Sequence, residues 1–340
     1  MTTKPGVLIW GIAGASLGME VAKSLKLDGG FSIYGCDISS GAFGHFSQVF
    51  DRTFVLDRDS PIETILANRE RLSFGYLVAG GDEVARICAD RNDELDSIGV
   101  TYVGNSASVV SLCSDKYASM LSLESHGVPV PWTKLLSEVT PKDHYCPFPL
   151  VVKPRQESGG SRGISVVRDS AELTHLMSSI RGEHQQYVCQ EYLKQDSDEL
   201  TIGVLSSTSR EVAGAILMRR AFHSRLSVMA STSDYLISSG SSQGAIFTDT
   251  SISQQALHMA SVLQSSGPMN IQGRLRDGKL IPFEINPRFS ASVYLRALAG
   301  VNEPALYIRH LSNGAVITYP TYQNGLALRS FTEIFAPEVG

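Results

Sequence analysis

The first third of the chain alternates short apolar runs with helical stretches, and this rhythm limits the fold more than any other feature of the sequence. Apolar runs at residues 7–10, 31–37, 74–80 and 100–104 are separated by amphipathic stretches at 19–27 and 63–72. Strands that alternate with helices predict a parallel sheet with crossover helices. We therefore expect an α/β domain over residues 1–112.

From Ser114 onward the pattern changes to an α+β arrangement. Residues 114–116 begin a helix, residues 129–131 (Pro-Val-Pro) start a linker, and strands at 148–154 and 164–167 enclose a glycine-rich loop. The strands at 187–193, 199–207 and 211–220 have connections too short for crossovers, so we expect them in one antiparallel sheet. A helix near 253–266 and strands at 269–275 and 280–286 follow, and the serine-rich residues 231–242 predict a mobile loop.

Charge and cysteine content exclude several classes of protein. The formal net charge is -5, which argues against a general electrostatic grip on nucleic acid or on an anionic membrane. No apolar run approaches the length that crosses a bilayer. The five cysteines are scattered and never form a C-x-x-C pair, so neither a disulfide framework nor a zinc site is indicated. We expect an untargeted, soluble cytoplasmic protein.

A glycine turn at residues 11–18 (GIAGASLG) follows the first predicted strand, and Asp37 ends the next strand. Backbone N–H groups at such a turn can hold an anion, so the pattern is compatible with a dinucleotide site. Glycines are also needed simply to pass tightly from a strand into a helix. Both interpretations remain open from the sequence.

A second glycine-rich loop, residues 157–163 (ESGGSRG), lies just after Lys153. A flexible loop between two strands can fold over phosphates and offer several N–H donors, and Lys153 would add a positive charge. The loop is not a P-loop, because no Gly-Lys-Ser/Thr follows and a strand comes next. The alternative is a plain hairpin connection.

Residues 282–288 (PFEINPR) carry the third pattern. Glu284 and Asn286 are two apart on one predicted strand and therefore project from the same face. Oxygen ligands on one face suit Mg²⁺ that bridges nucleotide phosphates. Gln272 could supply a third oxygen if residues 276–279 make a hairpin turn. The alternative is a polar edge that faces solvent.

Taken together, six segments in this order resemble the ATP-grasp superfamily, in particular its carbamoyl-phosphate-synthase-like carboxylate–amine ligases. The segments are residues 114–116, 151–154, 158–163, 190–193, 198–201 and 283–288. The resemblance implies a Rossmann-like pre-ATP-grasp domain at 1–112 and an α+β ATP-grasp domain at 113–340. Within the latter it implies an ATP-lid subdomain at about 133–193 and a catalytic subdomain at 194–340.

The resemblance also implies ATP and Mg²⁺ as cofactors, with Mn²⁺ as an alternative metal, and it assigns roles to matching residues. The expected nucleotide contacts are Lys116, Lys153, Ser158, Gly159, Gly160, Ser161, Gln190, Glu191, Leu193 and Glu199. The expected metal ligands are Gln272, Glu284 and Asn286, and the expected catalytic residues are Arg288, Arg274 and one of the adjacent Arg219 and Arg220. Asp82 and Glu83, at the end of a predicted strand, are expected to face substrate.

The function implied is an ADP-forming ligase that activates a carboxylate as an acyl phosphate and joins it to an amine. An amino acid or small peptide is the expected carboxylate, and the partners are small molecules, with a homodimer left open. The chain has one ATP-grasp unit and no glutaminase region, so carbamoyl phosphate synthesis itself is not expected. Two alternatives stay open: a nicotinamide-dependent oxidoreductase that uses the residue 11–18 turn, and a non-catalytic nucleotide-binding protein.

Overall fold

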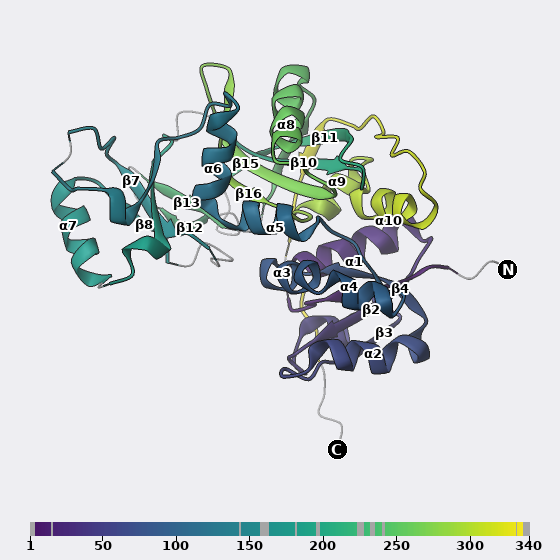
Figure 1. Ribbon diagram of the computed structural model, residues 1–340. Helices are drawn as coiled ribbons and strands as arrows, with labels where there is room; N and C mark the ends of the chain where they lie inside the picture. The colour runs from purple at the N-terminus through teal and green to yellow at the C-terminus, as the bar shows by residue number, and fades with distance from the viewer. Residues whose placement is uncertain are drawn as a thin grey trace.

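The computed structural model describes residues 4–14, 16–142, 144–156, 163–180, 182–194, 198–222, 228–231, 235–239, 242–330 and 332–335. Three larger sheets organise these residues, and the six-stranded sheet lies between the other two (Figure 1). A five-stranded sheet is built from the N-terminal part of the chain, and a four-stranded sheet lies at the far end of the molecule. In the described part of the chain, no helix is long and apolar enough to cross a membrane.

The N-terminal sheet confirms the predicted α/β fold. Its strands are all parallel, in the order β3-β2-β1-β4-β5, and helices connect most of them. The elements are β1 (Gly6–Trp10), α1 (Leu17–Asp28), β2 (Ser32–Asp37), the short 3₁₀ helix η1 (Phe43–Phe46), β3 (Arg52–Val55), α2 (Pro61–Leu72), β4 (Phe74–Ala79), α3 (Asp82–Asp90), α4 (Asn92–Ser97) and β5 (Thr101–Tyr102). β3 is short and lacks a continuous apolar run, which is why the sequence pattern did not reveal it.

The four-stranded sheet is antiparallel and has the order β6-β9-β7-β8. Before it come α5 (Ala107–Ser114) and α6 (Lys116–Ser125); its own elements are β6 (Thr133–Leu135), η2 (Leu136–Glu138), β7 (Leu150–Pro154), β8 (Ser165–Val167), α7 (Ser170–Ser179), η3 (His184–Gln186) and β9 (Tyr187–Glu191). One expectation was wrong. β9 does not join the strands that follow it; it pairs with β6 and β7, because Cys189 of β9 packs with Leu150 and Val152 of β7 in one apolar cluster.

The six-stranded sheet has the order β16-β15-β10-β11-β14-β17 and is antiparallel. Its strands and helices are β10 (Glu199–Ser206), β11 (Val212–Arg220), β14 (Gly244–Phe247), α8 (Thr250–Val262), β15 (Pro268–Arg276), β16 (Lys279–Asn286), α9 (Val293–Leu298), α10 (Glu303–Asn313) and β17 (Gly325–Ala327). Leu200, Ile202, Ile271 and Ile285 pack with α8 in one apolar cluster. Since side chains alternate along a strand, the residues between them form the opposite face.

A separate two-stranded ribbon, β12 (Val228–Ser231) and β13 (Leu236–Ser238), occupies part of the serine-rich stretch. The expectation of a mobile loop over residues 231–242 was therefore wrong for the strand residues. The pair Leu236-Ile237 supplies the apolar side chains that anchor this ribbon to the rest of the molecule. Serine content had hidden that short apolar signal.

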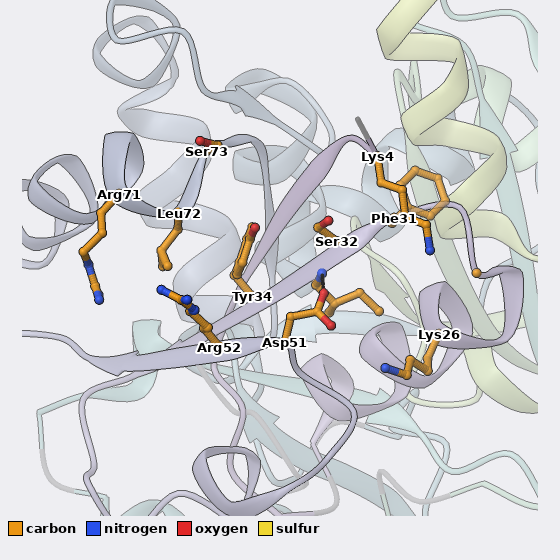
Figure 2. Close-up of a pocket in the computed structure, with 12 residues that line it drawn as sticks. Lys4, Lys26, Phe31, Ser32, Tyr34, Asp51, Arg52, Arg71, Leu72 and Ser73 are labelled. Carbon is orange, nitrogen blue, oxygen red and sulfur yellow. Dashed lines mark hydrogen bonds between the residues drawn. The ribbon is translucent and has the colours of Figure 1, made fainter. Parts of the chain in front are cut away.

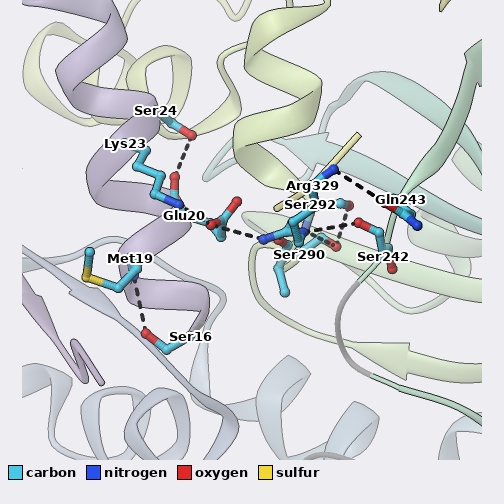
Figure 3. Close-up of polar contacts among 11 residues, drawn as sticks. Ser16, Met19, Glu20, Lys23, Ser24, Ser242, Gln243, Ser290, Ser292 and Arg329 are labelled. Atoms are coloured by element: carbon cyan, nitrogen blue, oxygen red, sulfur yellow. Dashed lines mark hydrogen bonds and ion pairs between the residues drawn. The ribbon is translucent and has the colours of Figure 1, made fainter. Parts of the chain in front are cut away.

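Arg329, just beyond β17, ties the N-terminal domain to the six-stranded sheet (Figure 3). Its guanidinium contacts Glu20 of α1 at 3.0 Å and donates to the backbone oxygens of Ser242 at 3.3 Å and Ala291 at 2.6 Å. Glu20 is itself buried and also binds Lys23 at 2.9 Å. One side chain thus connects three segments that are far apart in sequence.

Candidate active site

The polar face of the six-stranded sheet brings the expected metal ligands together. β15 and β16 form the predicted hairpin, and its turn residues Asp277 and Gly278 both have positive φ, 53° and 74°, as a type I′ turn requires. In this register Gln272 lies directly opposite Glu284. Asn286 lies on the same face two residues further along β16, because side chains alternate. The local hairpin chemistry therefore places three side-chain oxygens on one surface.

A bulge in β16 connects this hairpin to Lys153. The register shifts between Gln272 and Gly273, so Phe283 has no partner on β15. Its carbonyl oxygen accepts a hydrogen bond from Lys153 Nζ at 2.8 Å, and Gln190 Oε1 accepts a second at 2.9 Å. The Lys153 side chain reaches this point from β7 of the four-stranded sheet. The bulge thus leaves a carbonyl available to hold an ammonium group beside Glu284.

The environment of Lys153 disfavours the charged form of its side chain. Only 5% of the residue is exposed. Burial lowers the pKa of Lys153 from 10.5 to about 8, while Glu284 acts in the opposite direction and Lys116 adds to the lowering. A buried ammonium with so few compensating charges is well suited to receive an anionic group.

Lys116 begins α6, where Asp115 is the N-cap and accepts hydrogen bonds from the backbone N–H groups of Tyr117 and Ala118. Arg155 pairs with the same Asp115 carboxylate at 2.6 Å, and the Lys116 N–H donates to the Arg155 carbonyl. Burial lowers the pKa of Lys116, and Glu284, Asp82 and Asp115 raise it in compensation. The helix start therefore fixes Lys116 against the end of β7.

Glu199 lies between two arginines at the start of β10. Its carboxylate contacts Arg220 at 2.9 Å and Arg274 at 2.6 Å, and all three side chains are buried. The structure also separates the two adjacent arginines that the sequence could not distinguish. Arg219 points to the opposite face of β11, where it is half exposed and pairs with Asp198 at 2.7 Å. Of these two adjacent arginines, it is Arg220 that lies on the polar face with Glu199.

A cavity between the four-stranded and six-stranded sheets gathers most of the expected nucleotide contacts. Gln190, Glu191 and Leu193 form one side of it, and Gln190 is held by Lys153 and by Thr133 Oγ1 at 3.1 Å. Sequence reasoning missed several apolar lining residues, whose only signal was a run of aliphatic side chains near the glycine-rich or serine-rich loops. These are Val151, Ile164, Leu236 and Ile237.

A second cavity, of about 520 Å³, lies between the N-terminal domain and β16. Asp82 and Glu83, at the start of α3, line it together with Asn286. Arg288 approaches from the end of β16 and pairs with Asp82 through two hydrogen bonds, Nε to Oδ1 at 2.8 Å and a terminal nitrogen to Oδ2 at 3.1 Å. Although burial acts to raise it, Arg288 holds the pKa of Asp82 below its ordinary value.

The two cavities meet at Lys116 and Glu284, which line both. A third hollow, of about 580 Å³, is lined by Lys4, Lys26, Arg52 and Arg71 and lies at the amino ends of the N-terminal strands (Figure 2). Ligands of open parallel sheets bind at the carboxyl ends of the strands, where Gly11, Gly80 and Asp82 line the second cavity. The paired cavities are therefore the candidate active site.

The residue 11–18 turn serves packing. Asp37 is buried, and its two carboxylate oxygens accept from the backbone N–H groups of Ile12 at 2.9 Å and Ser39 at 3.0 Å. A Cβ on Gly18 would lie 2.0 Å from the Gly11 carbonyl oxygen. Glycine there allows α1 to approach the strand end, and Asp37 is already engaged by the chain itself. This arrangement does not favour the oxidoreductase alternative.

The second glycine-rich loop cannot be placed in the site. Ser158, Gly159, Gly160 and Ser161 lie outside the described residues. Their contact with phosphates therefore stays a prediction. Gly163, which follows them, has φ 69° and leads into β8.

The donor set fits Mg²⁺. Gln272, Glu284 and Asn286 offer oxygens from neighbouring positions of one hairpin, and Mg²⁺ is commonly held by one or two carboxylates together with substrate phosphates. The buried Asn286 Nδ2 has no hydrogen-bond partner among the described residues, while its Oδ1 accepts from Arg288 at 3.3 Å. No group of three His, Cys, Asp or Glu side chains elsewhere in the described chain could hold a metal.

Comparison with known proteins finds similarity to the same superfamily over part of the chain. Residues 183–334 match a family profile described as "ATP-grasp in the biosynthetic pathway with Ter operon". The D-alanine–D-alanine ligase A of Bacillus cereus is 32% identical over 115 residues, which cover 33% of this chain and 37% of that enzyme. The chain thus spans little more than a third of the length of this relative.

Two solved structures resemble nearly the whole chain. The L-amino acid ligase from Bacillus licheniformis has a TM-score of 0.64 at 16% identity and covers 91% of this chain and 74% of its own. The biotin carboxylase domain dimer of Hydrogenobacter thermophilus 2-oxoglutarate carboxylase, solved with MgADP, ADP and bicarbonate, has a TM-score of 0.62 at 15% identity and covers 92% and 70%. At these identities the likeness establishes the fold: a parallel α/β domain followed by an antiparallel α+β domain.

Proposed function

We propose that the chain is a member of the ATP-grasp superfamily and, on that premise, an ADP-forming ligase that joins a carboxylate to an amine. ATP with Mg²⁺ is the cofactor pair of this superfamily, as expected from the sequence. The observation that carries the proposal is that Lys116 and Glu284 line both cavities. A phosphoryl group held between them would lie within reach of a nucleotide on one side and of a second substrate on the other.

The charges around this junction fit phosphoryl transfer to a carboxylate. Lys153 and Lys116 present two ammonium groups near the expected phosphates, and Arg288, through its pair with Asp82, adds a guanidinium on the substrate side. Such transfer depends on positioning and charge stabilisation more than on covalent participation by the protein. Mg²⁺, held by Gln272, Glu284 and Asn286, would neutralise charge on the phosphates. The carboxylate would leave this step as an acyl phosphate.

Acidic and basic groups in the second cavity support an amino acid or small peptide as the substrate class. Asp82 and Glu83 can receive an ammonium group, and Arg86 and Arg288 can hold a carboxylate. The likeness to an L-amino acid ligase favours the same class. Glu199, Gln190, Glu191 and Leu193 would contact the nucleoside, and the residue 158–161 loop would cover the phosphates.

The test is a screen for ADP release over pairs of amino acids, with mass detection of the joined product. We expect ADP, phosphate and a product that is one water lighter than the two substrates combined. When the carboxylate carries ¹⁸O, the label should appear in the released phosphate, because an acyl phosphate leaves one carboxylate oxygen bonded to phosphorus. AMP with pyrophosphate as products would overturn the mechanism. Nucleotide binding without turnover on any pair would instead support the non-catalytic alternative.

A further inference from the structure

The pair between Asp82 and Arg288 links the N-terminal domain to the end of β16 inside the substrate cavity. Arg288 uses Nε and one terminal nitrogen to bind both oxygens of Asp82, at 2.8 and 3.1 Å. The same terminal nitrogen donates to Asn286 Oδ1 at 3.3 Å. Arg288 therefore binds two groups at once: the Asp82 carboxylate, which is expected to meet an amine, and the Asn286 amide oxygen, which is expected to meet the metal.

The pair is not required to hold the domains together. Arg329 and Glu20 make a buried link, and Arg309 contacts Asp28 at 2.6 Å on another surface. The side chain of Asp82 is 42% exposed, whereas that of Arg288 is 17% exposed. A ligand in the cavity can therefore reach the carboxylate without disturbing the packing around the guanidinium.

We propose that Asp82 holds Arg288 back until an ammonium group binds Asp82, so that the amine substrate itself releases the arginine toward the transferred phosphoryl group. This inference rests on the proposed function and names the second substrate as a cationic amine. A carboxylate beside Arg288 neutralises the charge that phosphoryl transfer needs there. An ammonium that binds Asp82 cancels the carboxylate, and the guanidinium becomes available. Acyl phosphate then forms only when a nucleophile is in place to consume it.

The exchange also affects the metal ligands. While Arg288 donates to Asn286 Oδ1, that oxygen is engaged by the guanidinium and is less available to a metal ion. Movement of Arg288 toward a phosphoryl group would leave Asn286 Oδ1 open. Asp82 is thus a positioning residue in the resting state and a substrate contact in the loaded state.

The first experiment compares the wild type with Asp82→Asn and with Asp93→Asn, a matched control at an exposed acidic residue in the first turn of α4. Calorimetry measures the affinity of each for ADP and Mg²⁺ with and without aluminium fluoride, which imitates the transferred phosphoryl group. In aluminium fluoride, Asp82→Asn should bind about tenfold tighter than the wild type, because Arg288 no longer has a competing carboxylate. Asp93→Asn should match the wild type, and without fluoride all three proteins should agree. Methylammonium, the simplest ammonium probe, should tighten binding in the wild type and have no effect on Asp82→Asn.

The second experiment needs neither nucleotide nor metal. Arg288 Nε–H donates to Asp82, so in ¹⁵N-arginine-labelled protein its resonance should be protected from exchange with water; the variant Arg288→Lys identifies the signal. The signal should broaden in Asp82→Asn and on addition of methylammonium to the wild type. If Asp82→Asn fails to fold, Asp82→Ser serves in both experiments, since a serine also suits the start of a helix.

Equal or weaker fluoride-dependent binding by Asp82→Asn would overturn the proposal, because it would mean that Asp82 holds Arg288 in its working position. A protected resonance that ignores methylammonium would overturn it as well. Neither readout requires ligation. A protein that shows both effects and joins no amino acids would refute the ligase proposal alone, whereas ligation without either effect would refute only the release of Arg288.

Discussion

Lys153 should give the wild-type protein a distinctive dependence of stability on pH. Its folded-state pKa is about 8, lowered by burial from 10.5. Between these two values the unfolded chain binds more protons at this position than the folded chain does. The free energy of unfolding must then rise with pH through this window. Below pH 8 the folded protein carries a buried charge, and that unfavourable term is at its full size.

The magnitude follows from the two pKa values. Relative to neutral pH, Lys153 should contribute about 1.4 kcal/mol of added stability at pH 9 and about 2.5 kcal/mol at pH 10. Urea denaturation of the wild type and of Lys153→Met at pH 7, 8, 9 and 10 isolates this contribution as the difference between two curves. Lys279→Met, which removes an exposed lysine in the β15–β16 hairpin, is the matched control and should run parallel to the wild type.

Parallel curves for the wild type and Lys153→Met would refute the reasoning, because they would show that Lys153 titrates alike in the folded and unfolded chains. A difference that grows in the opposite direction would mean that Glu284 outweighs burial and raises the pKa of Lys153. Either result would also weaken the view that the ammonium is held in readiness for an anionic ligand.

Three further predictions concern the polar face of the six-stranded sheet. Glu284→Ala should abolish ADP formation and leave the melting temperature within a few degrees of wild type, because Glu284 lines the two cavities and lies outside the apolar clusters; turnover near wild type at limiting Mg²⁺ would remove it from the metal site. Arg220→Ala should destabilise the protein by about 3 kcal/mol in urea denaturation, because Glu199 loses one of two buried partners, whereas Arg219→Ala should change stability by less than about 1 kcal/mol; equal losses would contradict the facing assigned to the two arginines. Gln272→Glu should lower the Mg²⁺ concentration that gives half-maximal nucleotide binding, since a second carboxylate would face the metal; an unchanged or higher requirement would place Gln272 outside the coordination sphere.

Local patterns were sufficient to predict the parts of the fold that depend on local chemistry. The rhythm of the first 112 residues predicted the parallel sheet, and the Asp-Gly turn predicted the hairpin that sets Gln272 opposite Glu284. The placement of β9 was wrong because the choice of partner strand is decided by burial in three dimensions, which neighbouring residues do not encode.

In the candidate site, too, local sequence predicted some features and distant contacts determined the others. The spacing of Glu284 and Asn286 placed them on one face, since alternation is a property of any strand. The contact of Lys153 with the Phe283 carbonyl and the pairing of Glu199 with two arginines had no signal in the sequence, because each depends on a partner more than 20 residues away. To decide which of Arg219 and Arg220 faces the site, one needs only to know which residues of β11 lie on each face of the sheet. The register with β10 supplies that information.

Arg329 links α1 to the loop after β16, and the position of this link bears on which part of the site can move when a ligand binds. This link, like that between Arg309 and Asp28, lies away from the two cavities, so the walls of the substrate cavity are joined before any ligand arrives. The four-stranded sheet is held differently: Lys153 to Phe283 and Arg276 to Glu191 are contacts at the nucleotide cavity itself. We therefore expect a nucleotide that enters this cavity to replace these contacts. We expect the four-stranded sheet to change position when nucleotide binds, while the walls of the second cavity, joined by Arg329 and Arg309, keep theirs.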